Sequence, residues 1–182
     1  LHPIIALSCT KDAQDAILAD DELAKTIDII DIRYWHYNTE GLWAPEAGKN
    51  LAPRQFMRKM KVGKTGFEEA YKAVKEYRDC YPDKAVTFYS QQYPTYGWAI
   101  LMAGGSCPNI KVNSEKFLKD VTTMRCMTLN NNEKCKIMGE SETGYVIYMT
   151  DKSEITIPVN AGSYRINRIE TKDGNVKCII KS

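Results

Sequence analysis

The chain has 182 residues, which is enough for one large domain or two small ones. Its 25 basic and 23 acidic residues leave a net charge of +2, so the chain lacks the dense basic stripe of a nucleic-acid-binding protein. No stretch approaches the roughly 18 to 20 consecutive apolar residues of a membrane-spanning helix, and we expect no membrane span.

The first 110 residues alternate short apolar runs with helical patterns, which is typical of βα units that build a parallel sheet. The second predicted strand carries two acids, Asp28 and Asp31, which a buried strand tolerates only when they have polar partners. The strands are predicted over residues 3–7, 27–32 and 85–89, and the helices over 12–25 (with a break near Asp20 and Asp21), 67–80 and 96–103.

A long connection, residues 33–66, separates the second strand from the helix at 67–80. Connections longer than about 12 to 15 residues are uncommon in compact domains and are usually either functional or disordered. This one is rich in aromatic residues, which argues against disorder. We therefore expect residues 33–66 to be a functional loop.

Residues 111–182 have a different pattern. After a helix predicted at 115–122, short runs with a period of two are separated by turn residues, as in an antiparallel sandwich or barrel. We therefore expect two domains, 1–110 and 111–182. The predicted strands of the second domain cover residues 134–138, 145–149, 154–159, 164–170 and 176–181.

The six cysteines are even in number but widely spaced, with no CxxC pair and no Cys/His cluster, so we expect no structural metal. No glycine-rich phosphate loop is present either, and no cofactor is expected. Buried free thiols and one or two disulfides, such as Cys126 with Cys135, are both compatible with the spacing.

Three parallel strands make an incomplete sheet. A parallel sheet is normally covered on both faces and needs neighbours at its edges. The first domain therefore requires more strands than it contains, as it would if it were the end of a (β/α)8 barrel. The alternative is a compact three-stranded α/β domain.

Several segments resemble the end of the barrel in bacterial apiosidase-like glycoside hydrolases: IDIIDIRYWHY at 27–37, NLAPRQ at 50–55, DKAV at 83–86 and GWA through MAGG at 97–105. The segment from GYVIY at 144–148 to GSYR at 162–165 is similar to the small C-terminal sandwich of these proteins, which is often called collagen-binding. The resemblance implies an α/β part followed by an all-β part, namely strands six to eight of the barrel and then a small antiparallel β-sandwich.

The same resemblance implies a function and a location. The chain would be a fragment of a secreted, periplasmic or cell-surface glycoside hydrolase that supplies one rim of the active site. Its partners would be carbohydrate and the remainder of the same barrel, and it would lack the complete pair of catalytic carboxylates. The alternative is a non-catalytic carbohydrate- or protein-binding module.

Active sites of such barrels lie at the carboxyl ends of the strands, which points to the residues that follow the second and third strands. The candidate catalytic carboxylates there are Asp31 and Glu40. Arg33 either pairs with Asp31 or binds substrate oxygen atoms directly, and aromatic side chains either stack on sugar rings or pack the loop. The candidate substrate-binding residues are Arg33, Trp35, His36, Tyr37, Trp43, Gln91, Gln92 and Trp98. We expect Trp35, His36 and Trp43 to line one depression together with Gln91 or Trp98.

Overall fold

The computed structural model describes residues 2–45, 65–89, 96–112, 114–127, 135–140, 144–149, 154–157, 159–171 and 174–181. The chain divides into two compact units, Leu1–Ile110 and Lys111–Ser182. The division falls where the sequence changes from alternating strands and helices to strands in succession. The α/β content followed by β content that the sequence predicts is confirmed.

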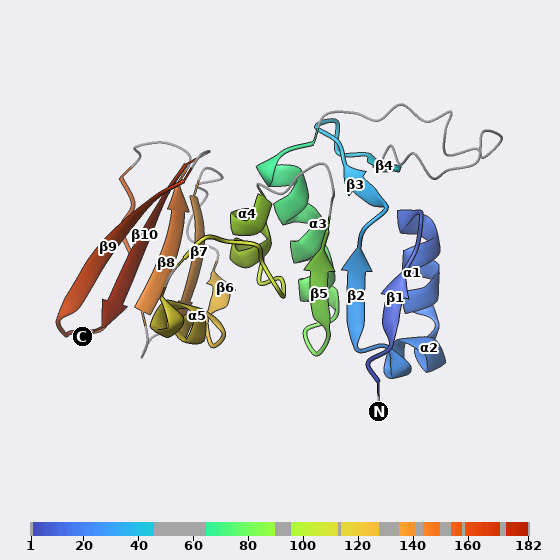
Figure 1. Cartoon of the computed structure of the whole chain (residues 1–182), viewed down its shortest axis with the longest axis horizontal. Coiled ribbons are helices and arrows are strands. Elements are labelled where there is room, and N and C mark those ends of the chain that lie inside the picture. Colours follow the sequence, from blue (N-terminus) through green and yellow to red (C-terminus); the bar gives the residue numbers. More distant parts are fainter. Residues whose placement is uncertain are drawn as a thin grey trace. The chain divides into compact units, whose positions relative to one another are not determined.

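The first unit is built on a three-stranded sheet of order β1-β2-β5 (Figure 1). The strands β1 (Ile5–Leu7), β2 (Ile29–Ile32) and β5 (Ala85–Phe88) are all parallel. Two helices, α1 (Lys11–Ala19) and α2 (Asp21–Thr26), connect β1 to β2, and α3 (Phe67–Cys80) precedes β5. A short helix, α4 (Gly97–Met102), follows β5. The described strands form an open sheet, not a closed barrel.

The break between α1 and α2 falls where the sequence predicts it. Asp20 ends α1 and caps α2, because its carboxylate accepts hydrogen bonds from the backbone N–H groups of Glu22 and Leu23. Thr10 caps α1 in the same way through Ala13. The start of α1 is thereby fixed just beyond the carboxyl end of β1.

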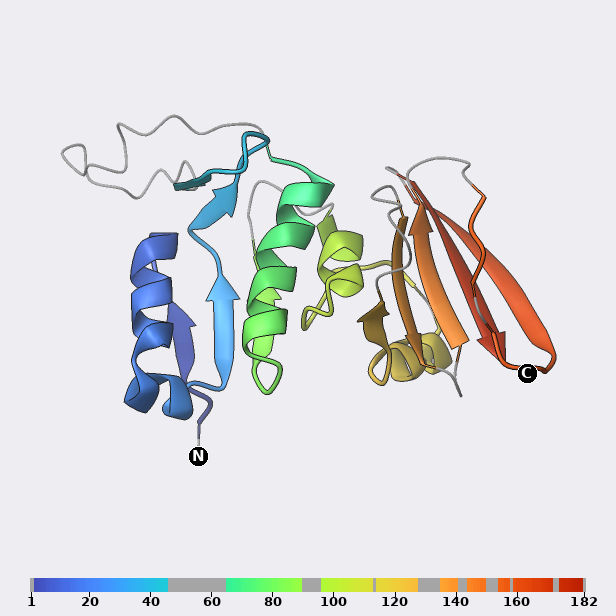
Figure 2. The same cartoon turned by 180° about the vertical axis from the view of Figure 1, so that it is seen from behind.

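The two faces of the parallel sheet differ. Ala6, Ile30 and Val86 lie side by side in the register and are buried in the main core of the unit. Both α1 and α3 lie on this side, behind the strands in Figure 1 and in front of them in Figure 2. Ile5 and Leu7 alternate with Ala6, and their side chains are 51% and 39% exposed. One face of the sheet is therefore packed, and β1 leaves large apolar side chains open on the other.

The connection after β2 begins with a hairpin that the sequence analysis does not predict. Its strands are β3 (Trp35–Tyr37) and β4 (Trp43–Pro45), which pair antiparallel. The Asn38 side chain accepts hydrogen bonds from the backbone N–H groups of Glu40 and Leu42, and Gly41 takes a positive φ of 78°. The turn is thus specified locally by an asparagine and a glycine. Residues 46–64 of this connection lie outside the described residues.

The second unit consists of α5 (Glu115–Val121) and a five-stranded antiparallel sheet of order β6-β7-β8-β10-β9. Its strands are β6 (Arg125–Met127), β7 (Cys135–Glu140), β8 (Gly144–Met149), β9 (Tyr164–Thr171) and β10 (Gly174–Lys181).

The sequence predicts a sandwich of two sheets, whereas the described strands of this unit form one sheet. The strand predicted at 154–159 is also wrong, since residues 154–157 belong to no strand. Ile155 and Ile157 instead pack against a core of four buried residues on β7 and β8, which are Ile137, Tyr145, Ile147 and Met149. An irregular segment therefore provides apolar cover on this face, where a second sheet was expected.

The disulfide suggested between Cys126 and Cys135 is absent, and both are free thiols. The register places Cys126 opposite Met138, three residues along β7 from Cys135. At about 3.4 Å per residue this offset alone separates the two cysteines by roughly 10 Å. A disulfide requires Cα atoms within about 7 Å.

Candidate functional site

A small polar cluster lies at the carboxyl ends of β2 and β5. The carboxylate of Asp31 forms an ion pair with Arg33, with 2.7 Å between Oδ2 and a terminal guanidinium nitrogen. The hydroxyl of Thr87, the register partner of Asp31 on β5, donates to Oδ1 at 3.0 Å. The Arg33 guanidinium lies over the ring of Tyr89, 5.0 Å from its centre. Asp31, Arg33, Thr87 and Tyr89 together are called the strand-end cluster below.

The two charges of the strand-end cluster differ in exposure. The side chain of Asp31 is 5% exposed, whereas that of Arg33 is 42% exposed. Tyr89 is also half exposed. Both carboxylate oxygens of Asp31 are occupied, so the part of the cluster that reaches solvent is a guanidinium group beside an aromatic ring. The ion pair that the sequence analysis considered for Arg33 and Asp31 is formed.

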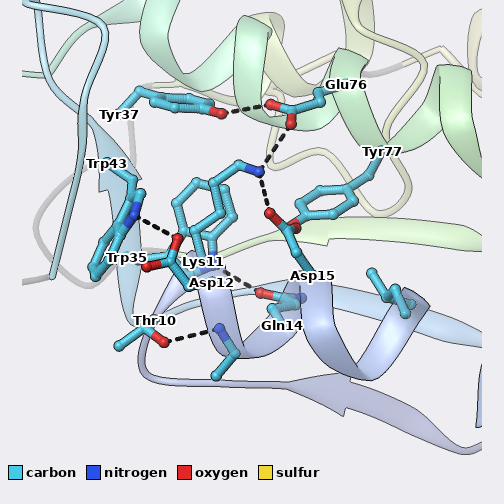
Figure 3. A network of polar contacts seen from close by, with 12 residues as sticks. Thr10, Lys11, Asp12, Gln14, Asp15, Trp35, Tyr37, Trp43, Glu76 and Tyr77 are labelled. Carbon is cyan, nitrogen blue, oxygen red and sulfur yellow. Dashed lines mark hydrogen bonds and ion pairs between the residues drawn. The ribbon is translucent and has the colours of Figure 1, made fainter. Parts of the chain in front are cut away.

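A second and larger polar network holds α1, α3 and the β3–β4 hairpin together (Figure 3). At its centre the Lys11 ammonium contacts the carboxylates of Asp15 at 2.6 Å and Glu76 at 2.9 Å. The hydroxyl of Tyr37 donates to Glu76, and that of Tyr77 donates to Asp15, both at 2.6 Å. We call Lys11, Asp15, Tyr37, Glu76 and Tyr77 the Lys11 network.

The protonated forms of its lysine and tyrosines are stabilised in the folded chain. Burial lowers the pKa of Lys11, but the hydrogen bonds to Asp15 and Glu76 outweigh that effect, so its pKa lies above the ordinary 10.5. Burial raises the pKa of Tyr37, and its hydrogen bond to Glu76 raises it further. Burial likewise raises the pKa of Tyr77, together with its hydrogen bond to Asp15. At neutral pH Lys11 is therefore charged, and the phenols of Tyr37 and Tyr77 are neutral.

The tryptophans of the hairpin are also tied to α1. The indole N–H of Trp35 donates to the Gln14 side chain at 2.7 Å, and that of Trp43 donates to Asp12 at 3.0 Å. Gln14 in turn donates to the backbone carbonyls of Ala6 and Asp31. These contacts fix the start of the long connection against the sheet, and Arg33 lies two residues before the anchored hairpin.

The aromatic side chains expected to stack on sugars are mostly used in packing. Trp35 is 1% exposed and Tyr37 is 7% exposed, and their rings pack edge to face, with 5.6 Å between ring centres. His36 is buried as well. In this structure Trp35 therefore has no exposed face for a sugar ring, because its ring fills the core between α1 and α3. Trp43 is half-buried against the same core.

Two of the remaining candidates, Glu40 and Trp98, lie on other elements than the strand-end cluster. Glu40 is exposed in the hairpin turn, where its backbone N–H bonds to Asn38. Trp98 is half-buried on α4. Gln91 and Gln92 lie outside the described residues, so the depression expected between them and the tryptophans stays a prediction.

Sequence reasoning missed the Lys11 network. Its only local signal is the spacing of four between Lys11 and Asp15, which is common on solvated helices. The other partners come from far along the chain, and a helical period identifies Tyr77 only as a core residue. Thr87 was missed because it lies inside a predicted strand and carries no pattern of its own.

None of the described helices is long and apolar enough to cross a bilayer. Within the described ranges no three His, Cys, Asp or Glu side chains are grouped as metal ligands. Neither a curated protein nor a solved structure matches the chain.

One family model does match. Residues 1–124 correspond to a domain of unknown function designated DUF6298. The matched region includes the whole parallel sheet, the strand-end cluster and the Lys11 network, and it continues through α5. Because the match covers well over half of the 182 residues, the chain belongs to the DUF6298 family.

Proposed function

We propose that this chain supplies one rim of the substrate-binding face of a secreted or cell-surface glycoside hydrolase. In this proposal β1, β2 and β5 are three successive strands of a (β/α)8 barrel. Two features of the sheet support it: the strands are parallel and in sequential order, and the helices that connect them lie on one side. In a barrel that side faces outward, and the open side with Ile5 and Leu7 faces the interior.

The observation that carries the functional part is the position of the strand-end cluster. Barrel enzymes place their active sites at the carboxyl ends of the strands, and Arg33 and Tyr89 follow β2 and β5 directly. A half-exposed aromatic ring beside a guanidinium group offers a sugar both an apolar surface and hydrogen-bond donors. We assign Arg33 and Tyr89 to carbohydrate binding.

Asp31 has a different role in this proposal. A glycosidase needs two carboxyl groups about 5 to 9.5 Å apart across the scissile bond. Both oxygens of Asp31 are engaged, by Arg33 and Thr87, which suits a residue that orients Arg33 better than one that attacks a sugar. We therefore place the catalytic pair in the part of the barrel that this chain does not supply.

The test is hydrolysis by the full protein encoded in the reading frame of this chain. Release of reducing ends is measured on a panel of polysaccharides for the wild type, Arg33→Ala, Tyr89→Ala and Asp31→Asn. Loss of one good substrate contact costs about 1 to 3 kcal/mol, so kcat/KM for Arg33→Ala should fall roughly 5- to 150-fold. Arg168→Ala, which changes an exposed arginine of the second unit, is the matched control and should retain full activity.

Absence of hydrolysis on every polysaccharide would contradict the proposal. If the 182-residue chain then still bound an oligosaccharide, its function would be that of a non-catalytic carbohydrate-binding module. Activity that survives Arg33→Ala and Tyr89→Ala unchanged would place the substrate elsewhere.

A further inference from the structure

Arg33 is held on two sides within the strand-end cluster. Asp31 fixes one terminal nitrogen at 2.7 Å, and Thr87 holds that carboxylate in place through its other oxygen. The ring of Tyr89 supports the plane of the guanidinium group. The Arg33 Nε atom is buried and makes no hydrogen bond within the part of the chain that the structure describes. Because the Arg33 side chain is 42% exposed and only one terminal nitrogen is paired with Asp31, the other terminal nitrogen can still donate to a ligand although the group is held in position.

The charged group that the cluster presents to solvent can only donate. A guanidinium group has five N–H donors and no acceptor, whereas a carboxylate accepts only. The acceptors of Asp31 are both used and lie in a side chain that is 5% exposed. A neutral sugar hydroxyl is both a donor and an acceptor, so it matches a mixed site better than a site of donors. An acceptor-only ligand group fits the exposed part of the cluster best.

We propose that Arg33 binds the carboxylate of an acidic sugar, so that the carbohydrate recognised here contains uronic acid residues. The choice of a sugar rests on the proposed function, whereas the choice of a carboxylate rests on the cluster itself. Arginine forms paired, charge-assisted hydrogen bonds with planar carboxylates, and an arginine that is already held in place loses little freedom on binding. Tyr89 lies where the ring of the same sugar residue can contact it.

The experiment is a calorimetric titration of the purified 182-residue chain, which requires no catalysis. The ligands are trigalacturonic acid, its fully methyl-esterified form and sodium sulfate. We expect the free acid to bind at least about tenfold more tightly than the ester, because esterification removes the charge that the guanidinium group recognises. Arg33→Met should abolish this preference. Arg33→Lys keeps the charge but not the planar fork, and it should recover only part of the preference.

Two controls accompany these variants. Arg165→Met changes an exposed arginine of the second unit by the same chemistry and should bind like the wild type. Thermal melts monitored by circular dichroism identify a variant that fails to fold. In that case the readout comes from the wild-type chain, as the ability of the methyl ester to displace bound trigalacturonic acid. Equal affinity for acid and ester would overturn the proposal. So would displacement of trigalacturonate by an equal concentration of sulfate, which would indicate a general anion site.

The outcome separates this inference from the proposed function. If the acid binds in an Arg33-dependent way and the full protein hydrolyses nothing, the carboxylate site is supported and the hydrolase is contradicted. Hydrolysis of neutral polysaccharides that is unaffected by Arg33→Met would support the hydrolase and contradict the carboxylate site.

Discussion

Lys11 links α1 to α3 through its ion pair with Glu76. Its side chain is 10% exposed and separates two carboxylates that would otherwise face each other. Lys11→Met removes the charge but keeps most of the volume, and it leaves Asp15 and Glu76 without their shared partner. We expect the free energy of unfolding to fall by about 1 to 3 kcal/mol, because both carboxylates are partly hydrated and can recover some of the loss.

Urea unfolding monitored by tryptophan fluorescence measures this effect. The matched control is Lys25→Met, which removes an ion pair with Glu22 whose side chains are 69% and 86% exposed. That change should stay within about 0.5 kcal/mol, as is usual for surface pairs. Equal effects of the two substitutions would show that the Lys11 network contributes nothing beyond a surface ion pair.

The Lys11 network also predicts how stability responds to alkali. Lys11, Tyr37 and Tyr77 have higher pKa values in the folded chain than the ordinary 10.5 for lysine and 10.0 for tyrosine. Their contribution to stability is therefore complete below about pH 10 and is lost as the pH rises through the folded values. The unfolding free energy should be level from about pH 7 to 9 and fall above pH 10.

Urea unfolding at a series of pH values tests this for the wild type and Tyr77→Phe. The variant lacks one of the three groups, so its unfolding free energy should decline less steeply above pH 10. Identical slopes for the two proteins would mean that Tyr77 titrates in the folded chain as it does in the unfolded chain.

At the scale of single elements, α4 is held by a close backbone approach. A Cβ atom built on Gly97 would collide with the backbone carbonyl of Asn109, which cannot move independently of its chain. Gly97→Ala should therefore displace α4 and cost about 1 to 3 kcal/mol or more. Gly66→Ala is the matched control: its Cβ would meet only the flexible end of Glu69, so its cost should stay below about 1 kcal/mol. Thermal denaturation of both variants provides the comparison.

The elements also show where sequence patterns succeed and where they fail. The helix α3 begins and ends where predicted, because Phe67, Tyr71, Val74 and Tyr77 repeat at helical spacing and Gly66 precedes them. The hairpin of β3 and β4 could not be predicted in this way. Its strands have three residues each, too few for a period, and its position depends on the contact of Tyr37 with a residue 39 positions away.

The residues of the candidate site likewise include some that the sequence identifies and some that it does not. Asp31 and Arg33 could be identified as a pair because they are adjacent to a predicted strand end. Thr87 and the exposure of each charge could not, since they depend on the register of β2 with β5. The place of Trp35 stayed open in the sequence because an aromatic residue in a loop suits a sugar site and a core equally, and its burial and its contact with Gln14 are visible only in the structure.

For the whole molecule, the open face of the parallel sheet predicts self-association of the isolated chain. Ile5 and Leu7 on β1 are 51% and 39% exposed, and fully exposing one such side chain costs roughly 1.5 to 3 kcal/mol. We expect sedimentation equilibrium to show concentration-dependent association that is relieved by the pair Ile5→Lys and Leu7→Lys. Leu42→Lys, at an apolar residue that is 63% exposed in the hairpin turn, is the control and should leave association unchanged. A monomer at all concentrations would favour a compact three-stranded domain over a barrel segment.

The contact between Tyr77 and Asp15 spans 62 positions in the chain and ties the first helix to the third. Separation of α1 from α3 would break the ion pair of Lys11 with Glu76 and the hydrogen bond from Tyr77 to Asp15. The amide protons of the two helices should therefore exchange with solvent through the same opening event, with one shared free energy. The polar contacts between α1 and α3 should thus make these two helices open as one cooperative unit, a role usually given to a hydrophobic core.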